Sequence, residues 1–279
     1  MRLGINSYTY MWSIGFKGAH PAYPEREARP TRPMTLLDLL RKARELGVSL
    51  VQTGPNLPLE ALSEAEIAEF IQTAQEWGIE LELGTRGLDY EHLVRQIGLA
   101  KRMGARLIRT LPEVGGIYDA DGSLIPAALR QVAPLLENEG ILLGIENGRT
   151  PAALLAAALD EVSSPNVGVV LDMVNSLAVP EGWKDVTRIL APYTMCVHYK
   201  DFTIRRQWHM MGFLCEGTPA GQGMVETQWL LEQLQASRYP FNVIVELWPP
   251  EQGSVDETAA LERAWAVESV RYLRQFIPG

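Results

Sequence analysis

Ile141-Leu-Leu-Gly-Ile-Glu146 is the first of four short apolar runs on which the interpretation of this chain depends. The others are Val167-Gly-Val-Val-Leu-Asp172, Met195-Cys-Val-His198 and Val243-Ile-Val-Glu246. Runs this continuously apolar are typical of strands that are covered on both faces, as in a parallel sheet. Each run ends in a residue that can bind a metal ion. The pattern therefore predicts three carboxylates and one imidazole at the carboxyl ends of four buried strands.

The spacing of these four residues predicts that they meet. Glu146, Asp172 and His198 follow one another at steps of 26 residues, the length of one strand-helix unit, and Glu246 follows after 48 residues. In a closed barrel the carboxyl ends of the strands converge over one mouth, whereas in an open sheet they are spread along a line. Alternate residues of a strand share a face, so each ligand points to the same side as the residue two positions before it.

Strand and helix patterns alternate through the whole chain. Strand patterns occur at Leu3–Asn6, Ser49–Gln52, Ile79–Leu83, Arg106–Thr110, Ile141–Glu146, Val167–Asp172, Met195–His198 and Asn242–Leu247. Helical patterns lie at about 34–46, 63–77, 89–103, 123–139, 151–161, 183–191, 227–237 and 256–276. Glycines follow several of the helix ends as C-caps, and Ser63 with Glu66 predicts a capping box at the start of one helix.

Eight strand-helix units in a chain of 279 residues predict a (β/α)8 barrel of the α/β class. We expect one domain that spans residues 1–279, with long loops after strands 1 and 7. An open doubly wound sheet is the alternative. It fits less well because Asn6-Ser7-Tyr8-Thr9-Tyr10, rather than a glycine-rich fingerprint, follows the first strand.

The bulk composition excludes several classes of protein. The chain is 47% hydrophobic and 21% charged, and its formal net charge of -9 argues against nucleic acid or an anionic membrane as partner. No apolar run approaches the roughly 18 residues of a membrane span, and the first residues lack the apolar core of a signal peptide. Two cysteines provide no disulfide framework, and we expect Cys196 to be a small core residue. A cytoplasmic location is therefore expected.

Two connections are longer than a barrel scaffold requires. Residues 11–33 follow the first strand and residues 202–224 follow the seventh, so both leave the carboxyl-terminal face, where barrel active sites lie. Long ordered loops in compact domains are usually functional. We expect both connections to be lids, with a plain surface insertion as the alternative.

The four strand-end residues predict a metal site. Taken singly, each could be a polar residue that is satisfied by a loop backbone, but three carboxylates facing one another would repel without a counter-charge. Carboxylate oxygens with a single imidazole suit Mn²⁺ or Mg²⁺, and also Co²⁺, better than a structural zinc ion, which prefers Cys and His. We therefore expect one divalent cation, Mn²⁺ first.

The strand-end motifs resemble those of the xylose-isomerase-like TIM barrel superfamily. They are Ile145-Glu146-Asn147, Leu171-Asp172-Met-Val-Asn175, His198-Tyr-Lys200-Asp201 and Val245-Glu246, with Gly221-Gln222-Gly223 as a further similarity. The resemblance implies a single Mn²⁺ or Mg²⁺ held by Glu146, Asp172, His198 and Glu246. It also implies that Glu146 and Glu246 act as the acid/base pair, as the matching glutamates do in ketose epimerases.

That chemistry agrees with the predicted site. A cation that chelates a carbonyl and the adjacent hydroxyl acidifies the C–H bond between them, and a carboxylate removes the proton to give a metal-bound enediolate. One departure from the superfamily is Asn175, which stands where many members carry histidine and cannot relay a proton at neutral pH. Lys200 faces the same side as His198 and is a catalytic candidate, with a salt bridge to a neighbouring carboxylate as the equally weighted alternative.

Cationic side chains give weight to an anionic substrate. Arg205, Arg206 and His209 lie in the connection after strand 7 and Arg109 ends strand 4, and guanidinium groups bind carboxylate or phosphate. A 3-oxo sugar acid would be decarboxylated through the same enediolate. The segments His209-Met-Met-Gly-Phe and Asn175-Ser-Leu-Ala-Val-Pro-Glu-Gly resemble 3-oxo-isoapionate decarboxylases of the superfamily. Tyr8 and Trp248 are expected to form an apolar wall against the substrate.

These observations favour a metal-dependent isomerase or epimerase that acts on a small ketose or keto sugar acid. The alternative is a lyase of the same superfamily, either a decarboxylase of a 3-oxo sugar acid or a dehydratase. A DNA-repair endonuclease of the same fold would need many histidines, and the chain has four together with its net charge of -9. We expect a small sugar or sugar acid as substrate, no nucleic-acid or membrane partner, and a homodimer or homotetramer.

Overall fold

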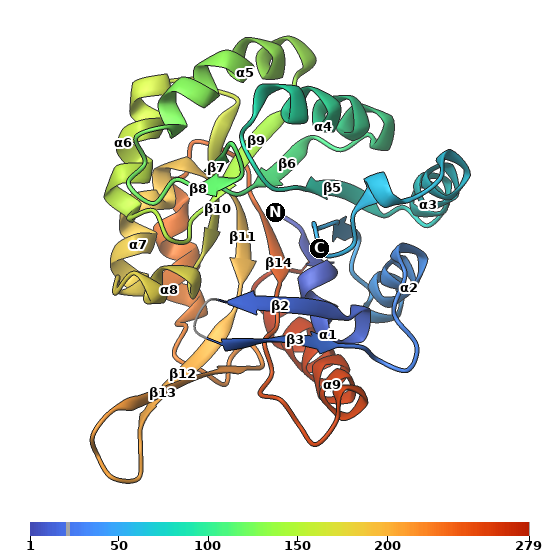
Figure 1. Cartoon of the computed structure of the whole chain (residues 1–279), viewed down its shortest axis with the longest axis vertical. Helices are drawn as coiled ribbons and strands as arrows, with labels where there is room; N and C mark the ends of the chain where they lie inside the picture. The colour runs from blue at the N-terminus through green and yellow to red at the C-terminus, as the bar shows by residue number, and fades with distance from the viewer. Residues whose placement is uncertain (21–22, 279) are drawn as a thin grey trace. The chain divides into compact units, whose positions relative to one another are not determined.

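The computed structural model describes residues 1–20 and 23–278. Eight strands close into a barrel (Figure 1), and their order around it is β1 (Leu3–Asn6), β14 (Asn242–Val245), β11 (Thr194–Tyr199), β10 (Val167–Asp172), β9 (Leu142–Glu146), β6 (Leu107–Thr110), β5 (Glu80–Gly84) and β4 (Leu50–Gln52). Neighbouring strands run parallel, as the pairs β9–β10 and β10–β11 show. The predicted α/β barrel is confirmed.

The chain divides into two compact units. The first unit comprises residues 1–2, 80–199 and 227–244, and the second comprises residues 3–79, 200–226 and 245–279. Each unit has its own helices, its own buried residues and its own part of the predicted site. The expectation that residues 1–279 form a single domain stays a prediction.

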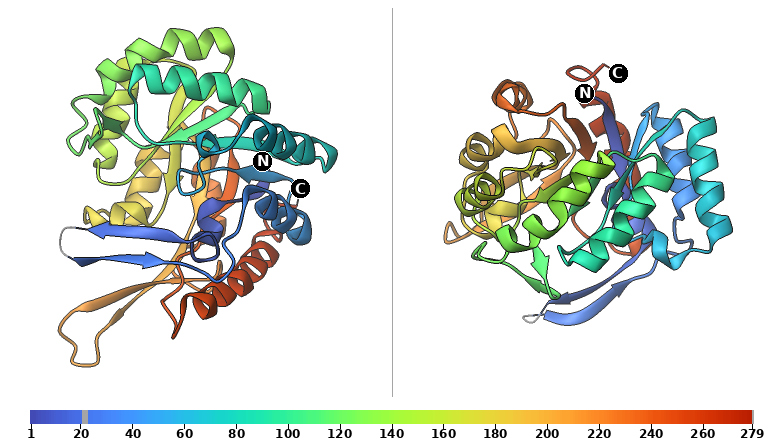
Figure 2. Two further views of the ribbon diagram at one scale, coloured as in Figure 1. Left: turned by 45° about the vertical axis from the view of Figure 1, so that its right-hand side comes forward. Right: turned by 90° about the horizontal axis from the view of Figure 1, so that it is seen from above.

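The first unit places helices outside its strands (Figures 1 and 2). These helices are α4 (Tyr90–Met103), α5 (Ile125–Glu139), α6 (Ala152–Val162), α7 (Trp183–Leu190) and α8 (Thr227–Gln233). A short hairpin, β7 (Glu113–Val114) with β8 (Ile117–Tyr118), and three 3-10 helices, η3 (Asn175–Ala178), η4 (Ala191–Tyr193) and η5 (Leu234–Ala236), complete it. Strand β10 is buried along its whole length, as a strand covered on both faces must be.

Gly144 in β9 shows how closely the strands of the first unit pack. A Cβ atom at this position would lie 2.7 Å from Cγ2 of Val170 on the neighbouring strand β10. The Val170 side chain thus fills the space that a side chain at Gly144 would need, two positions before the predicted ligand Glu146. Cys196 is fully buried in β11, which confirms the expectation of a small core residue.

The second unit combines barrel strands, helices and two long hairpins. Besides β1 and β4 it contains η1 (Ser7–Tyr10), α1 (Met11–Ile14), α2 (Leu36–Leu46), η2 (Leu59–Ala61), α3 (Glu64–Glu76) and α9 (Val255–Leu273). One hairpin is formed by β2 (Phe16–His20) and β3 (Tyr23–Ala28), and the other by β12 (Asp201–Arg206) and β13 (Phe213–Thr218). Both predicted long connections are therefore present, and each contains a hairpin.

The helix boundaries follow the predicted signals closely. The capping box at α3 is formed, since Ser63 N donates to Glu66 Oε2 at 2.8 Å and Glu66 N donates to Ser63 Oγ at 3.3 Å. Such a cap stabilises a helix by about 1 kcal/mol. One expected helix is shorter than predicted, because α8 ends at Gln233 and the chain tightens into η5. The last strand also ends earlier, at Val245 rather than Leu247.

Membrane insertion finds no support in the helices. Among the residues that the structure describes, no helix combines the length and the apolar character needed to cross a bilayer. The cytoplasmic location stays a prediction.

Candidate metal centre

Three of the predicted ligands meet in the first unit. Glu146 ends β9, Asp172 ends β10 and His198 lies in β11, and one ligand atom of each lies within 4.8 Å of the others. The strand register explains this, because Asp172 pairs directly with His198. His198 Nδ1 lies 3.1 Å from Glu146 Oε2. All three side chains are buried.

This donor set fits a divalent cation. Two buried carboxylates beside an imidazole carry an excess of negative charge, which a cation balances. Ligand atoms bound at about 2.0–2.2 Å from one ion lie roughly 3 to 4.4 Å from each other, and the observed limit of 4.8 Å exceeds that range by only a few tenths of an ångström. Oxygen ligands with one nitrogen suit Mg²⁺, Mn²⁺ or Zn²⁺. The preference for Mn²⁺ stays a prediction.

Asn147 ties the ends of two strands together. Its Nδ2 donates to the carbonyl oxygen of Asp172 at 2.8 Å, and its Oδ1 accepts from the backbone N–H of Asp172 at 2.8 Å. The Asp172 carboxylate is oriented in turn by the backbone, because Oδ1 accepts from Val174 N at 2.7 Å and from Asn175 N at 3.0 Å. These bonds hold the side chain in one rotamer.

Glu146 is held by two residues that the sequence assigned to substrate binding. Arg109 donates from Nε to Glu146 Oε2, and Asn175 donates from Nδ2 to Glu146 Oε1 at 2.6 Å. Arg109 Nη1 also donates to the carbonyl oxygen of Thr85 at 3.2 Å. Because the Arg109 side chain is only 7% exposed, its ion pair with Glu146 is almost completely shielded from water. Arg109 and Asn175 are therefore at the site, in contact with a predicted ligand.

Glu246, Lys200 and Asn6 form a second cluster, in the second unit. Lys200 Nζ lies 2.8 Å from Glu246 Oε2, and Asn6 Nδ2 donates to Glu246 Oε1. The Glu246 side chain is 2% exposed and that of Lys200 is 16% exposed. The salt bridge weighed for Lys200 is thus formed, and its partner is a predicted catalytic residue. The roles of Glu246 as fourth ligand and of Lys200 in catalysis stay predictions.

The hairpin β12–β13 carries the remaining cationic candidates. Arg205 Nη2 pairs with Glu216 Oε2 at 2.9 Å, and Arg206 Nη1 donates to the carbonyl oxygen of Met210 at 3.0 Å. His209 Nδ1 accepts from Met211 N at 3.1 Å. All three side chains are exposed and their described contacts lie within the hairpin. Their role in substrate binding stays a prediction.

Tyr8 and Trp248 flank the cluster of the second unit. Tyr8 N donates to Asn6 Oδ1 at 2.9 Å, and Trp248 lies two residues beyond Glu246. The hairpin base packs closely on Trp248, since a Cβ atom at Gly217 would lie 3.0 Å from the indole ring. Both side chains are half-buried. The apolar wall expected of them stays a prediction.

Asn6 and Asn147 contact the predicted site residues, although the sequence analysis did not predict a role for them. Asn6 is the last residue of the predicted strand Leu3–Asn6, as the ligands are of theirs, and Asn147 directly follows the predicted strand Ile141–Glu146. A rule that every polar residue at a strand end is a candidate would have included them. Asn6 additionally caps η1, because its Oδ1 accepts from Tyr8 N and Thr9 N.

The glycine-rich turn before α8 encloses a carboxylate of its own chain. Asp201 accepts from Gly221 N at 2.8 Å, Gly223 N at 3.0 Å and Val225 N at 3.1 Å. A Cβ atom at Gly223 would lie 2.2 Å from Asp201 Oδ1, so only glycine fits there. Burial raises the pKa of Asp201 above its ordinary value, and these backbone donors oppose that rise. The turn therefore serves to hold Asp201.

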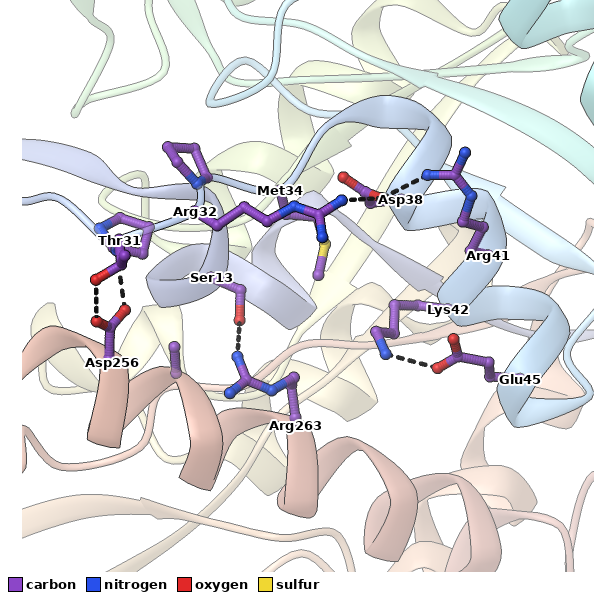
Figure 3. A pocket seen from close by; sticks show the side chains of 13 residues that line it. Ser13, Thr31, Arg32, Met34, Asp38, Arg41, Lys42, Glu45, Asp256 and Arg263 are labelled. Atoms are coloured by element: carbon purple, nitrogen blue, oxygen red, sulfur yellow. Dashed lines mark hydrogen bonds and ion pairs between the residues drawn. The ribbon is translucent and has the colours of Figure 1, made fainter.

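A separate hollow of about 740 Å³ lies in the second unit between α2 and α9 (Figure 3). It contains none of the candidate ligands. Its cations are engaged locally: Arg41 pairs with Asp38 at 2.6 Å, Lys42 with Glu45 at 2.6 Å, and Arg263 donates to Ser13 Oγ at 3.3 Å. The carboxylates and the imidazole that could hold a metal ion lie at the metal centre and not in this hollow.

Known proteins share this arrangement of strands. The sequence profile described as "Xylose isomerase-like TIM barrel" matches residues 14–275. A 3-oxo-isoapionate decarboxylase from Pectobacterium atrosepticum is 32% identical over 274 residues, which are 98% of this chain and 95% of that protein.

Two solved structures have a similar fold at low sequence identity. A D-psicose 3-epimerase determined in the presence of D-fructose aligns with a TM-score of 0.69 and 18% identity over 100% of both chains. A xylose isomerase-like TIM barrel protein from Mycobacterium smegmatis in complex with magnesium aligns with a TM-score of 0.67 and 19% identity over 97% of both chains. The profile match covers nearly the whole chain. The protein therefore belongs to the xylose isomerase-like TIM barrel family.

Proposed function

We propose that this protein is a divalent-metal-dependent lyase that decarboxylates a small 3-oxo sugar acid, of the class to which 3-oxo-isoapionate belongs. Its family includes enzymes that move hydrogen and enzymes that break carbon–carbon bonds. The decarboxylase from Pectobacterium atrosepticum matches this chain at 32% identity along almost its entire length. The choice between the two reactions rests on the surroundings of Glu146.

The observation that carries the proposal is that both oxygens of Glu146 are engaged. Arg109 donates to Oε2 and Asn175 donates to Oε1. Epimerisation needs a base to remove a proton from carbon, and Glu146 would have to give up one of these hydrogen bonds to do so. Asn175 cannot take over, because an amide does not accept and release a proton at neutral pH. Decarboxylation needs no removal of a proton from carbon.

Arg109 supports an anionic substrate. Its guanidinium is buried at the end of β6 and brings a fixed positive charge beside the predicted ligands. A guanidinium in a site shielded from water binds a carboxylate strongly and in a defined orientation. We assign to Arg109 the orientation of the substrate carboxylate, so that the bond to be broken lies perpendicular to the plane of the 3-oxo carbonyl group, where its electron pair can enter the carbonyl π system.

The reaction is a heterolytic cleavage of one carbon–carbon bond. The bond between the carboxylate and the adjacent carbon breaks, carbon dioxide leaves, and the electron pair moves to the 3-oxo group to give an enediolate. A divalent cation, when bound, polarises the substrate oxygens and makes them a better electron sink. The carbon then takes up a proton.

The proposal is tested by measuring the carbon dioxide that the reaction releases. Purified protein loaded with Mn²⁺ should release one carbon dioxide per molecule of 3-oxo sugar acid in a coupled assay. Arg109→Gln should lower kcat/KM by roughly 10- to 100-fold, since a hydrogen bond to a charged group contributes about 1.5–3 kcal/mol. Arg130→Gln is the control, because Arg130 is an exposed arginine of the same unit that pairs with Glu161 on the surface.

The second candidate is an isomerase or epimerase of a ketose. It is favoured by the presence of both Glu146 and Glu246, which match the acid/base pair of ketose epimerases. The two reactions give different products. If the protein exchanges a substrate C–H for deuterium and converts a ketose without any loss of carbon, the lyase assignment is wrong and the isomerase assignment is correct.

A further inference from the structure

The connection after β9 carries an arginine close to the predicted metal ligands. Arg149 lies three residues beyond Glu146, so their Cα atoms are at most about 11 Å apart. The connection joins β9 to α6, and connections of this kind surround the active site of a barrel enzyme. Arg149 is exposed, whereas Glu146 is buried. Arg149 is therefore a cation at the rim of the metal centre.

A tyrosine of the neighbouring connection holds Arg149 in place. Tyr118 Oη accepts a hydrogen bond from Arg149 N at 2.8 Å, and the Arg149 guanidinium lies over the Tyr118 ring, 5.3 Å from its centre. A guanidinium in this position is attracted by the π electrons of the ring. Tyr118 belongs to the short hairpin β7–β8, which follows β6 (Figure 1). One side chain thus contacts both the backbone and the charged head of Arg149.

Further contacts join the two connections on both sides of Arg149. A Cβ atom at Gly148 would lie 2.7 Å from Tyr118 Oη, so a larger residue there would push the hydroxyl away from Arg149 N. On the other side, Thr150 Oγ1 donates to the carbonyl oxygen of Asp119 at 2.6 Å. Gly148 and Thr150 are both buried. The backbone that carries Arg149 is therefore held in one position, which lowers the entropic cost of binding a ligand there.

The Tyr118 hydroxyl lies within the electrostatic reach of the metal centre. Burial raises the pKa of Tyr118 above its ordinary value, the N–H of Arg149 opposes that rise, and the negative charge of Glu146 adds to it. An interaction of this kind fades within about 10 Å in salt solution when the charges are exposed to water. Because Arg149 is held by the same hydroxyl, its guanidinium stands beside the predicted ligands.

Arg149 differs from the two other arginines on this side of the first unit. Arg86 pairs with Glu113 at 2.6 Å, and Arg109 donates to Glu146. Each of those two positive charges is therefore offset by a carboxylate. Within residues 1–20 and 23–278, Arg149 forms no ion pair with an acidic side chain, and the Tyr118 ring is its partner instead. Its charge is available to an anion that arrives from solution.

An anionic substrate needs such a charge in order to approach this protein. The chain has a formal net charge of -9, which repels anions, and a positive charge at the mouth of a site offsets that repulsion locally. Arg109 is only 7% exposed, so it acts on a substrate that is already inside. Arg149 is exposed and can act on the substrate as it arrives. A neutral sugar gains nothing from this charge.

We propose that Arg149 captures the carboxylate of the substrate at the rim of the metal centre and so selects sugar acids over neutral sugars, with Tyr118 as its positioning residue. This inference rests on the proposed function, because it takes a sugar acid as the substrate. A guanidinium binds a carboxylate through two parallel N–H donors. The contact forms before any bond breaks, so it contributes to the binding of the substrate and not to the rate of cleavage.

The first test separates KM from kcat in the carbon dioxide assay. Arg149→Gln should raise KM for a 3-oxo sugar acid by roughly 3- to 10-fold and leave kcat within about twofold, because the lost contact is equal in the ground and transition states. Arg149→Lys keeps the charge and should recover most of this loss. Arg130→Gln removes an equal charge from a surface ion pair of the same unit and should leave KM unchanged.

Tyr118→Phe tests the positioning role. The variant keeps the ring and loses the hydroxyl that accepts from Arg149 N, so KM should rise by roughly twofold or more while kcat is retained. In the Arg149→Gln background the same change should have no further effect, since the two residues then act as one unit. Equal effects of Tyr118→Phe in both backgrounds would overturn the positioning role.

A binding measurement tests the capture of an acid without any turnover. Calorimetry on the Mg²⁺-loaded protein compares D-gluconate, a sugar acid, with the neutral D-fructose. The wild type should bind gluconate more tightly, and Arg149→Gln should weaken gluconate binding by roughly 3- to 10-fold without affecting fructose. This difference should shrink between about 20 mM and about 200 mM salt, because salt screens an exposed charge.

The outcomes distinguish this inference from the proposed reaction. The capture role is overturned if the wild type binds gluconate no more tightly than fructose, or if Arg149→Gln changes the binding of both sugars equally or of neither. If the wild type releases no carbon dioxide but Arg149→Gln still weakens gluconate binding alone, the decarboxylase assignment is wrong and the capture of sugar acids by Arg149 stands.

Discussion

Glu262 offers the sharpest quantitative test of the structure. It lies fully buried in α9 and accepts hydrogen bonds from Trp12 N at 2.9 Å, from Ser13 N at 3.0 Å and from Ser13 Oγ at 2.9 Å. Through these bonds it holds α1, the segment that follows Asn6 and η1. Burial raises the pKa of Glu262 from 4.5 to about 7, and the N–H donors, the Ser13 hydroxyl and the nearby Arg263 only partly oppose this rise.

The direction of the resulting pH dependence follows from proton binding. Between pH 4.5 and 7 the folded chain keeps the Glu262 proton while the unfolded chain has lost it. The free energy of unfolding therefore falls as pH rises through this window. The contribution of the protonated form is fully present below pH 4.5 and is lost above pH 7. A shift from 4.5 to about 7 corresponds to roughly 3 kcal/mol.

The assay is urea unfolding of the wild type and of Glu262→Gln at pH 5 and at pH 8. Glutamine cannot ionise, so the difference in unfolding free energy between the two proteins should move by roughly 2.5 kcal/mol in favour of the variant between these pH values, since a small part of the effect is already lost at pH 5. Glu268→Gln, a more exposed position on the same helix that accepts a hydrogen bond from Gln222, is the control and should show no such movement. A difference for Glu262→Gln that is equal at both pH values within about 0.5 kcal/mol would refute the reasoning.

Three further predictions concern the site. Asp172→Asn should weaken Mn²⁺ binding at least 100-fold by calorimetry, because it removes a charged ligand; unchanged affinity would show that the ion binds elsewhere. Glu246→Gln should abolish turnover while the circular dichroism spectrum stays the same, and near wild-type activity would mean that the site is wrongly placed. Asn175→Ala should lower kcat/KM by roughly 5- to 50-fold through loss of a hydrogen bond to a charged group, about 1–2 kcal/mol. In that case an unchanged kcat/KM would remove Asn175 from the site.

Local patterns were sufficient to predict the barrel strands and the helices that follow them. Strands such as Val167–Asp172 are short apolar runs, and helices such as α3 begin at a capping box, so both depend on residues that are close in the chain. Equal steps of 26 residues then placed Glu146, Asp172 and His198 on consecutive strands. This part of the site could be predicted because the barrel repeats its unit along the sequence.

The two long hairpins, β2–β3 and β12–β13, were not predicted from the sequence. Residues 11–33 and 202–224 were recognised as long connections, but not as ribbons. Each hairpin forms because two neighbouring segments pair in one antiparallel register. The exposed residues of these segments do not alternate regularly between apolar and polar, so the sequence does not show that register. Which side chains of β12–β13 share a face became visible only from the pairing of its strands, for example of Arg206 with Phe213.

The sequence by itself determined the fold class, the family and the three residues that converge in the metal centre, because each of these follows from short-range periodicity and even spacing. The tertiary structure alone decided which partners those residues have. Arg109 meets Glu146 across 37 positions, Asn6 meets Glu246 across 240, and Glu262 meets Ser13 across 249. No local pattern encodes such contacts, since they exist only when strands and helices far apart in the chain are packed together, and burial then sets how strongly each pair interacts.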